Sequence, residues 1–368
     1  MIKLIDYHQL KNGNINNIPK QIMMKKLLFF MLISATCSSL VAQDVNSETP
    51  YMTKSLSGAS IKNVEVKTSG GSISVTGVNP SEARVEVYVR GNNQPGKLSK
   101  DEIERRLQEN YDLSVSVSNN KVTAIAKPKR QNMNGKESLS ISFRIFSPQN
   151  LISDLRTSGG SISLKNLTGS QDFQTSGGSL RVDDLSGKVR GRTSGGSIHV
   201  SNSKDDINLG TSGGSISAEN CNGNLSLTTS GGSLNLSDLD GNIEATTSGG
   251  SIQANNIKGQ LLTTTSGGSV KLNDLACSLE TSTSGGSMQV SLKELGKYVR
   301  ISNSGGNIDV QIPNKNVDLK LTGQRISIPS LNNFNGRMDK EEVEGKLNGG
   351  GIPVTVRAGS GRVNLSLR

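Results

Sequence analysis

The sequence is short of bulky side chains. Its 368 residues include no tryptophan, 3% aromatic residues and 32% hydrophobic residues. This composition excludes one thick globular core, but it suffices for a thin core shared along a stack of small units. Nucleic-acid binding sites combine stacking aromatic residues with clustered lysine and arginine, and the chain has neither. We therefore expect no nucleic-acid partner.

Catalytic side chains are equally scarce. Beyond residue 42 the chain has one histidine, His199, at an expected outward position, and two cysteines, Cys221 and Cys277. Neither cysteine has a candidate base near it, and no serine stands in a Gly-x-Ser-x-Gly elbow. Three repeats separate the cysteines, or roughly 14 Å at the spacing of parallel strands, which is too far for a disulfide. The sequence predicts two buried free thiols, no enzyme, no metal site and no cofactor.

The N-terminus has the pattern of an export signal. Residues 1–42 hold five lysines and one acid, which leaves +6 of the formal charge of +10 to the rest of the chain. A charged start at residues 23–26 precedes an apolar stretch from Leu27 to Ala35 and a small-residue end at residues 40–42. We expect translation to start at Met23 or Met24 and the mature chain to start at Gln43.

The predicted location is outside the cytoplasm. The apolar stretch of the signal is too short to span a membrane, and no later segment has about 18 consecutive apolar residues. Lipid anchoring through Cys37 is an alternative, although Thr36 replaces the small Gly or Ala usual before such a cysteine. We expect a secreted, periplasmic or cell-surface protein with no transmembrane segment.

The hexapeptide Thr-Ser-Gly-Gly-Ser-Ile organises the sequence. It first occurs at Thr68–Ile73, and from Thr157 onward its first glycine recurs at seven successive intervals of 18 residues and then after 20. A fixed period is typical of stacked repeats, in which each unit contacts its neighbours. We predict that the glycine pairs form the corners of successive coils: Gly159 and Gly160, Gly177 and Gly178, Gly195 and Gly196, Gly213 and Gly214, Gly231 and Gly232, Gly249 and Gly250, Gly267 and Gly268, Gly285 and Gly286.

The residue types within a unit favour strands. Eighteen residues fit five helical turns as well as nine strand pairs, but two adjacent glycines would destabilise a helix by about 2 kcal/mol per repeat. Counted from its Thr as position one, a unit is mostly apolar at positions six, eight, eleven and fifteen, as in Ile252, Ala254, Ile257 and Leu261. The alternation at positions six and eight is that of a strand with one inward face. The sequence thus predicts an all-β parallel solenoid.

A second turn is predicted near the middle of each unit. Position ten is Asn or Asp in seven consecutive units, and position thirteen is usually Gly. An Asn or Asp side chain that bonds the backbone two residues on, before a glycine with positive φ, makes a tight turn. Calcium binding at these turns stays open but disfavoured, because the Gly-Gly-Ser-Ile bend holds no acid and position ten is Asn as often as Asp.

The remaining segments frame this array. We expect a polar tether over residues 43–60, an irregular β section over 61–156, regular repeats over 157–322, and degenerate rungs with a cap over 323–368. Ser99 and Glu102 have the spacing of a capping box, which predicts one short helix over 99–110. Residues 91–97 resemble a phosphate-binding loop, but Leu98 stands where Ser or Thr is required, so we interpret them as a polar connection.

Three features together resemble a known family: the repeated hexapeptide with its Asn/Asp turns, the lead-in Phe143 to Pro148, and the closing Gly359 to Val363. The chain resembles the bacterial putative-adhesin family of β-strand-repeat proteins, a domain of unknown function, from about Ile61 to the C-terminus. The resemblance implies an exported, right-handed parallel β-helix at the cell envelope, with adhesion as its proposed role. It supplies no catalytic residues.

The favoured function is a non-enzymatic binding module whose partner is a surface glycan or protein. The alternatives are an envelope-stress or structural protein without a ligand of its own and, less favoured, a carbohydrate-active β-helix enzyme, which would need a charged cluster on one face. The sequence leaves the ligand and the oligomeric state open.

Overall fold

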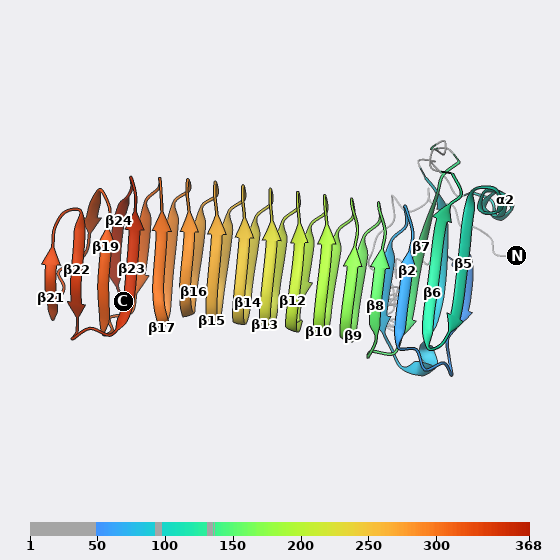
Figure 1. Cartoon of the computed structure of the whole chain (residues 1–368), viewed down its shortest axis with the longest axis horizontal. Coiled ribbons are helices and arrows are strands. Elements are labelled where there is room, and N and C mark those ends of the chain that lie inside the picture. The colour runs from blue at the N-terminus through green and yellow to red at the C-terminus, as the bar shows by residue number, and fades with distance from the viewer. Residues whose placement is uncertain (1–48, 93–97, 131–134, 136) are drawn as a thin grey trace, which may run out of the picture. The chain divides into compact units, whose positions relative to one another are not determined.

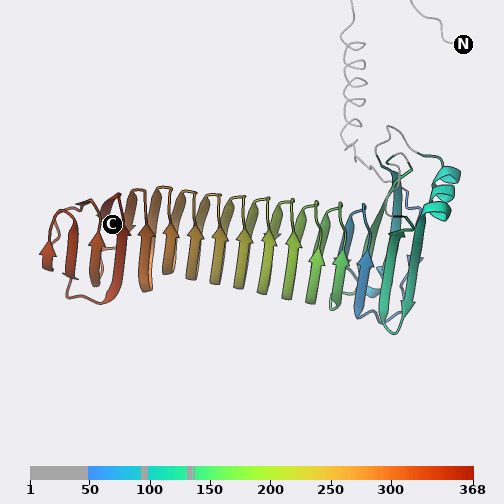
Figure 2. The same ribbon diagram turned by 45° about the horizontal axis from the view of Figure 1, so that its top comes forward.

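A computed structural model describes residues 49–92, 98–130, 135 and 137–368. The predicted export signal, its start sites and Cys37 lie outside these residues. Residues Pro50–Arg368 form one compact unit, in which strands of successive coils lie side by side (Figures 1 and 2). Over the described residues the fold is a parallel β-solenoid with one short α-helix, as the sequence predicts. In the described part of the chain, no helix is long and apolar enough to cross a membrane.

The strands of the array share an 18-residue register up to the first half of β17, where register shifts lengthen it to 20 residues. Leu234 pairs with Ile252, and Ile252 pairs with Val270, in parallel ladders. The strands from the first array coil to the last are β8 Ile152–Arg156, β9 Ile162–Gln174, β10 Leu180–Thr193, β11 Ile198–Ser201, β12 Lys204–Thr211, β13 Ile216–Thr229, β14 Leu234–Thr247, β15 Ile252–Thr265, β16 Val270–Thr283, β17 Met288–Asn303 and β18 Ile308–Ile312.

The core is a set of columns that run along the stack. Positions six, eight, eleven and fifteen are buried, as predicted, and position seventeen is buried as well, as at Phe173, Leu209 and Leu227. One unit alone would leave these side chains in water, whereas each buried one stabilises the fold by about 1.5–3 kcal/mol. Stacking is therefore what makes a unit stable.

Polar residues in these columns have local partners. Ser203 occupies position eleven, is buried, accepts a hydrogen bond from the Leu185 amide and donates one to the Ser201 carbonyl. The strand is interrupted there, between β11 and β12. Gln171 at position fifteen accepts a bond from the Ser153 hydroxyl at 2.6 Å and donates to the Leu151 carbonyl at 2.9 Å. Both polar groups are thus hydrogen-bonded, as burial requires.

The two cysteines are free and buried. Cys221 lies at position eleven, and its thiol donates to the Glu219 carbonyl. Burial raises the pKa of both thiols, that of Cys277 to about 12. The prediction of two buried free thiols is confirmed.

The N-terminal section consists of a helix, a 3-10 turn and strands that precede the array: β1 Met52–Ser55, β2 Asn63–Lys67, β3 Ile73–Gly77, η1 Pro80–Glu82, β4 Arg84–Gly91, α2 Lys100–Asn110, β5 Tyr111–Ser118, β6 Lys121–Pro128 and β7 Leu139–Ser147. The coil made of β2 and β3 lies directly against β8 and β9. Its other side pairs with β6 and β7, which come later in the chain. Beyond them, β5, β4 and β1 are antiparallel.

The described part of the predicted tether is not a tether. Within residues 49–60, β1 pairs with β4, and Leu56 is 2% exposed. The prediction over 43–60 is wrong for these residues, because their polar composition concealed one buried leucine and a strand that is held mainly through its backbone.

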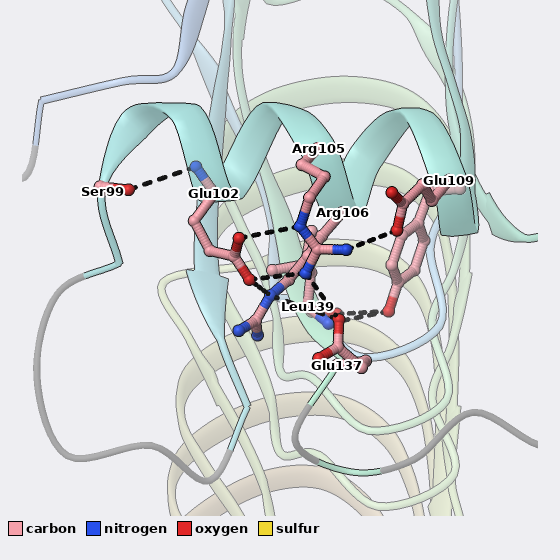
Figure 3. Close-up of polar contacts among 8 residues, drawn as sticks. Ser99, Glu102, Arg105, Arg106, Glu109, Glu137 and Leu139 are labelled. Atoms are coloured by element: carbon pink, nitrogen blue, oxygen red, sulfur yellow. Dashed lines mark hydrogen bonds and ion pairs between the residues drawn. The ribbon is translucent and has the colours of Figure 1, made fainter.

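The helix begins where the capping box predicts. The Ser99 side chain accepts a hydrogen bond from the Glu102 amide at 3.2 Å. The Glu102 carboxylate instead pairs with Arg105 and Arg106, which lower its pKa to about 2. Glu137 also pairs with Arg105, so this network ties α2 to the segment before β7 (Figure 3).

The C-terminal strands beyond the array are β19 Val317–Thr322, β20 Arg325–Ser327, β21 Phe334–Met338, β22 Glu342–Leu347, β23 Ile352–Ala358 and β24 Arg362–Leu367. The last coil, β23 and β24, inserts between β17 and β19 on one side of the coil and between β18 and β20 on the other. Stacking in chain order therefore ends at Ile312, ten residues before the predicted limit of 322. The end is completed by the antiparallel strands β22 and β21.

The threonine that opens each unit connects two coils. Thr229 is buried, and its hydroxyl donates to the Gly214 carbonyl of the preceding coil at 2.8 Å. The same oxygen accepts from the Gly232 amide of its own bend at 3.3 Å. Seven further threonines donate in the same way: Thr157, Thr175, Thr193, Thr211, Thr247, Thr265 and Thr283.

We predict that Thr229→Val destabilises the protein. Valine keeps the shape of threonine but leaves the Gly214 carbonyl and the Gly232 amide without this partner, which costs about 1–3 kcal/mol. Chemical denaturation of the two proteins measures the change. Thr228→Val is the matched control, because Thr228 is exposed and surface changes of this kind stay within about 0.5 kcal/mol. Equal losses in the two variants would contradict the assignment.

Candidate binding faces

The glycine pairs lie in the bends that precede each array strand, and the two members of a pair differ. A Cβ at the second glycine, for example Gly250, would stand 2.0 Å from the Gly232 carbonyl oxygen of the preceding coil. A Cβ at the first, Gly249, would meet nothing closer than 3.6 Å. None of the sixteen predicted corner glycines has a φ in the left-handed region. Close approach to the preceding coil, rather than unusual backbone geometry, therefore requires the second glycine.

The strand bends at position ten because of the backbone conformation of the residue there. All seven Asn and Asp residues of this column have φ between 51° and 57°, the left-handed region in which Asn and Asp are enriched. The glycines at position thirteen also have positive φ, as predicted, for example Gly241 at 132°. The side chains bond between coils, as Asn220 does to Asn202 and Asn256 to Asp238. These contacts between coils replace the predicted bond to the backbone two residues on.

Between the two bends each coil presents two outward faces. The 7/9 face carries the residues at positions seven and nine, and the 14/16 face carries those at positions fourteen and sixteen. Because parallel strands are about 4.8 Å apart, side chains at one position recur along a face at that spacing. A face is thus a regular lattice of side chains whose identity the core does not restrict.

A hollow of about 470 Å³ lies on the 14/16 face over β10 and β12 to β15. Its outward lining is polar except at one end. The residues are Lys188, Arg190, Asp206, Asn208, Asn224, Ser226, Asn242, Glu244, Gln260 and Leu262. Amide, carboxylate, hydroxyl and cationic groups therefore stand in register over five coils.

Hydrogen bonds fix the orientation of the amides in this hollow. Asn224 donates through Nδ2 to the Asp206 carboxylate at 2.8 Å, and Asn242 donates through Nδ2 to Asn224 Oδ1 at 3.0 Å. A carboxylate only accepts, so the ladder can run in one direction. Each Asn keeps a second Nδ2 hydrogen that this ladder does not use.

The 7/9 face holds two further hollows. One of about 240 Å³ lies over β13 to β16 and includes Ser217, Asn235 and Lys271. One of about 500 Å³ lies over β17, β18 and β24 and includes Gln289, Asp309 and Asn364. The Asn364 amide donates to Asp309 at 2.6 Å, so a polar side-chain contact also joins the inserted last coil to β18.

His199, the histidine weighed for chemistry, does not line any of these hollows. His199 is half-buried on β11, between the 7/9 face residues Arg181 and Ser217 of the neighbouring coils. The resemblance to a phosphate loop falls mostly on residues 93–97, outside the described residues. Within the described ranges, no group of His, Cys, Asp and Glu has a spacing that would hold a metal ion.

We predict opposite outcomes for alanine at the two corner glycines. Gly250→Ala forces the corners apart and destabilises the protein by about 1–3 kcal/mol or more. Gly249→Ala stays neutral or gains up to about 1 kcal/mol, because it restricts the unfolded chain. Denaturant midpoints of the two single variants test this. Similar losses at both positions would show that close approach is not the reason for the second glycine.

A model of the Toastrack DUF4097 family matches residues 112–366. Two solved structures are similar over 86% of this chain. One is a putative cell adhesion protein from Clostridium sporogenes, 11% identical, with 98% of its chain covered and a TM-score of 0.18. The other is a putative adhesin from Bacteroides fragilis, 12% identical, with 96% covered and a TM-score of 0.23. Similarity at this level says nothing of what this chain binds. No curated protein matches the sequence.

Proposed function

Since the chain belongs to the Toastrack DUF4097 family, a family without an assigned function, we propose a role from its outward faces. The protein is an exported, non-enzymatic binding module of the bacterial cell envelope that holds a surface glycan or protein, and so acts as an adhesin. The observation that carries this proposal is the lattice of polar side chains on the 14/16 and 7/9 faces, with its three hollows.

The distribution of chemistry in the coil supports binding over catalysis. The bends and core columns are used for stacking, and the variable polar residues stand on the two faces. The outward residues of the hollows carry mainly amides, hydroxyls and scattered charges, which suit hydrogen bonds to a polyhydroxylated or peptide surface. Catalysis would need a nucleophile or acid–base pair aimed at one point.

Export rests on the sequence pattern of residues 23–42 and gives a direct prediction. Protein isolated from its own cells should begin at Gln43, which mass spectrometry of the N-terminal peptide identifies. A lipid-modified N-terminal Cys37 would support the anchored alternative. A chain that retains residues 23–42 in the cytoplasm would refute export.

Binding is tested with the full chain as it is isolated. We expect the purified protein to bind a defined subset of glycans or envelope proteins on an array, and cells lacking it to adhere less well to surfaces that display those ligands. The same cells should show no induced envelope-stress response. An absence of binding together with an envelope-stress phenotype would favour the structural alternative and sink the adhesin proposal.

A further inference from the structure

We propose that the hollow on the 14/16 face binds a polysaccharide with sparse carboxylate groups, such as a polymer in which uronic acid residues alternate with neutral sugars. Lys188 and Arg190 hold a carboxylate of the polymer, and the Asn ladder that follows binds its hydroxyl groups. This inference rests on the proposed binding function and names the ligand class for one of its two faces.

The two cations stand at one end of the hollow and point outward from the same strand. Lys188 and Arg190 are exposed at positions fourteen and sixteen of β10. No hydrogen bond or ion pair joins either side chain to another described residue. An ammonium and a guanidinium group two residues apart on one strand face can hold one carboxylate between them.

The acids beside these cations are engaged elsewhere. Asp172 pairs with Arg190 in the ladder register, but its carboxylate binds Arg156 at 2.6 Å. Asp206 pairs with Lys188 in register, and its carboxylate accepts the Asn224 amide. Arg192, the next cation on β10, is held by the Asn208 side chain at 2.6 Å. Lys188 and Arg190 are therefore the two cations in this region that remain available to a ligand.

The rest of the hollow suits sugar hydroxyl groups. Asn224 and Asn242 each retain a donor hydrogen beyond the ladder bond, and Ser226, Glu244 and Gln260 add donors and acceptors across successive coils. These groups recur at about 4.8 Å along the stack, so an extended polymer laid along it meets a new set at every coil.

The charges in the hollow argue against a densely anionic polymer. Asp206 and Glu244 both line it, and they would repel the closely spaced charges of a nucleic acid or a heavily sulfated glycan. The lining also has no aromatic side chain on which a base could stack. A carboxylate on some sugars, with hydroxyls between, fits both the cations and the acids.

Calorimetric titration of the full chain with short oligosaccharides of hyaluronan and of unsulfated chondroitin, which carry one carboxylate for every two sugars, tests the proposal, with the methyl esters of both oligomers as neutral comparators. We expect the acids to bind at least about tenfold more tightly than the esters, because the esters lose the charge-assisted hydrogen bonds. This preference should shrink as salt is added, since both cations are exposed.

The double variant Lys188→Gln, Arg190→Gln should bind the acids as weakly as the esters, a loss of about tenfold or more. The matched control is Lys315→Gln, Arg357→Gln, which removes one exposed lysine and one exposed arginine outside the three hollows and should leave the affinity unchanged. A further variant, Asn224→Ala, Asn242→Ala, should weaken acid and ester alike. Circular dichroism and a denaturation curve for each variant confirm that the fold is kept.

Equal affinity for acid and ester, equal losses in the two charge variants, or no binding of either acid would overturn the inference. In each case the binding function is judged separately by the array: neutral glycans or proteins bound there would leave it standing without this ligand. If the protein bound nothing on the array, the proposed binding function itself would be refuted.

Discussion

One carbonyl oxygen in each corner limits how the bends of successive coils pack. The Gly232 carbonyl oxygen accepts a hydrogen bond from the Thr247 hydroxyl at 2.8 Å. A Cβ on Gly250 would stand only 2.0 Å from the same oxygen. The same oxygen is thus both the acceptor for the threonine and the atom that excludes a side chain at the second glycine. Both effects require threonine and glycine at fixed positions of the unit. Where the period lengthens to 20 residues, Asn303 stands in place of the threonine. Its side-chain amide donates to the Gly286 carbonyl, and its Oδ1 accepts from the Gly305 and Gly306 amides.

This division of labour separates stability from recognition. The bends and inward columns require Thr, Gly and apolar residues, so the same residue types recur in every unit. The outward positions contact mainly their neighbours on the same face, so the residues there differ from coil to coil. Stability then accumulates coil by coil, while any one hollow is defined by a few outward side chains. The clustering of Lys188 and Arg190 on one strand is an example of such local variation.

The sequence predicted the array well because its signals are local and repeated. Register, inward columns, the capped helix and the buried thiols follow from spacing and residue type. It did not predict the burial of position seventeen, where Gly191 lies against the ring of Phe173, because no single residue type marks that column. The hollows were not predicted either, since they depend on which outward residues of different coils meet. The order of the terminal coils was missed because β2, β3, β23 and β24 pair with strands distant in the chain.

The insertion of the terminal coils limits how such a molecule can change in length. At each end, one coil is held between the array and strands from another part of the chain, so a unit appended to either terminus would find no open ladder of the same register. A unit duplicated between β9 and β17 would pack against bends of the same Thr-Ser-Gly-Gly sequence on both sides. A change in length by whole 18-residue units in the interior therefore leaves the strand pairings at both ends intact.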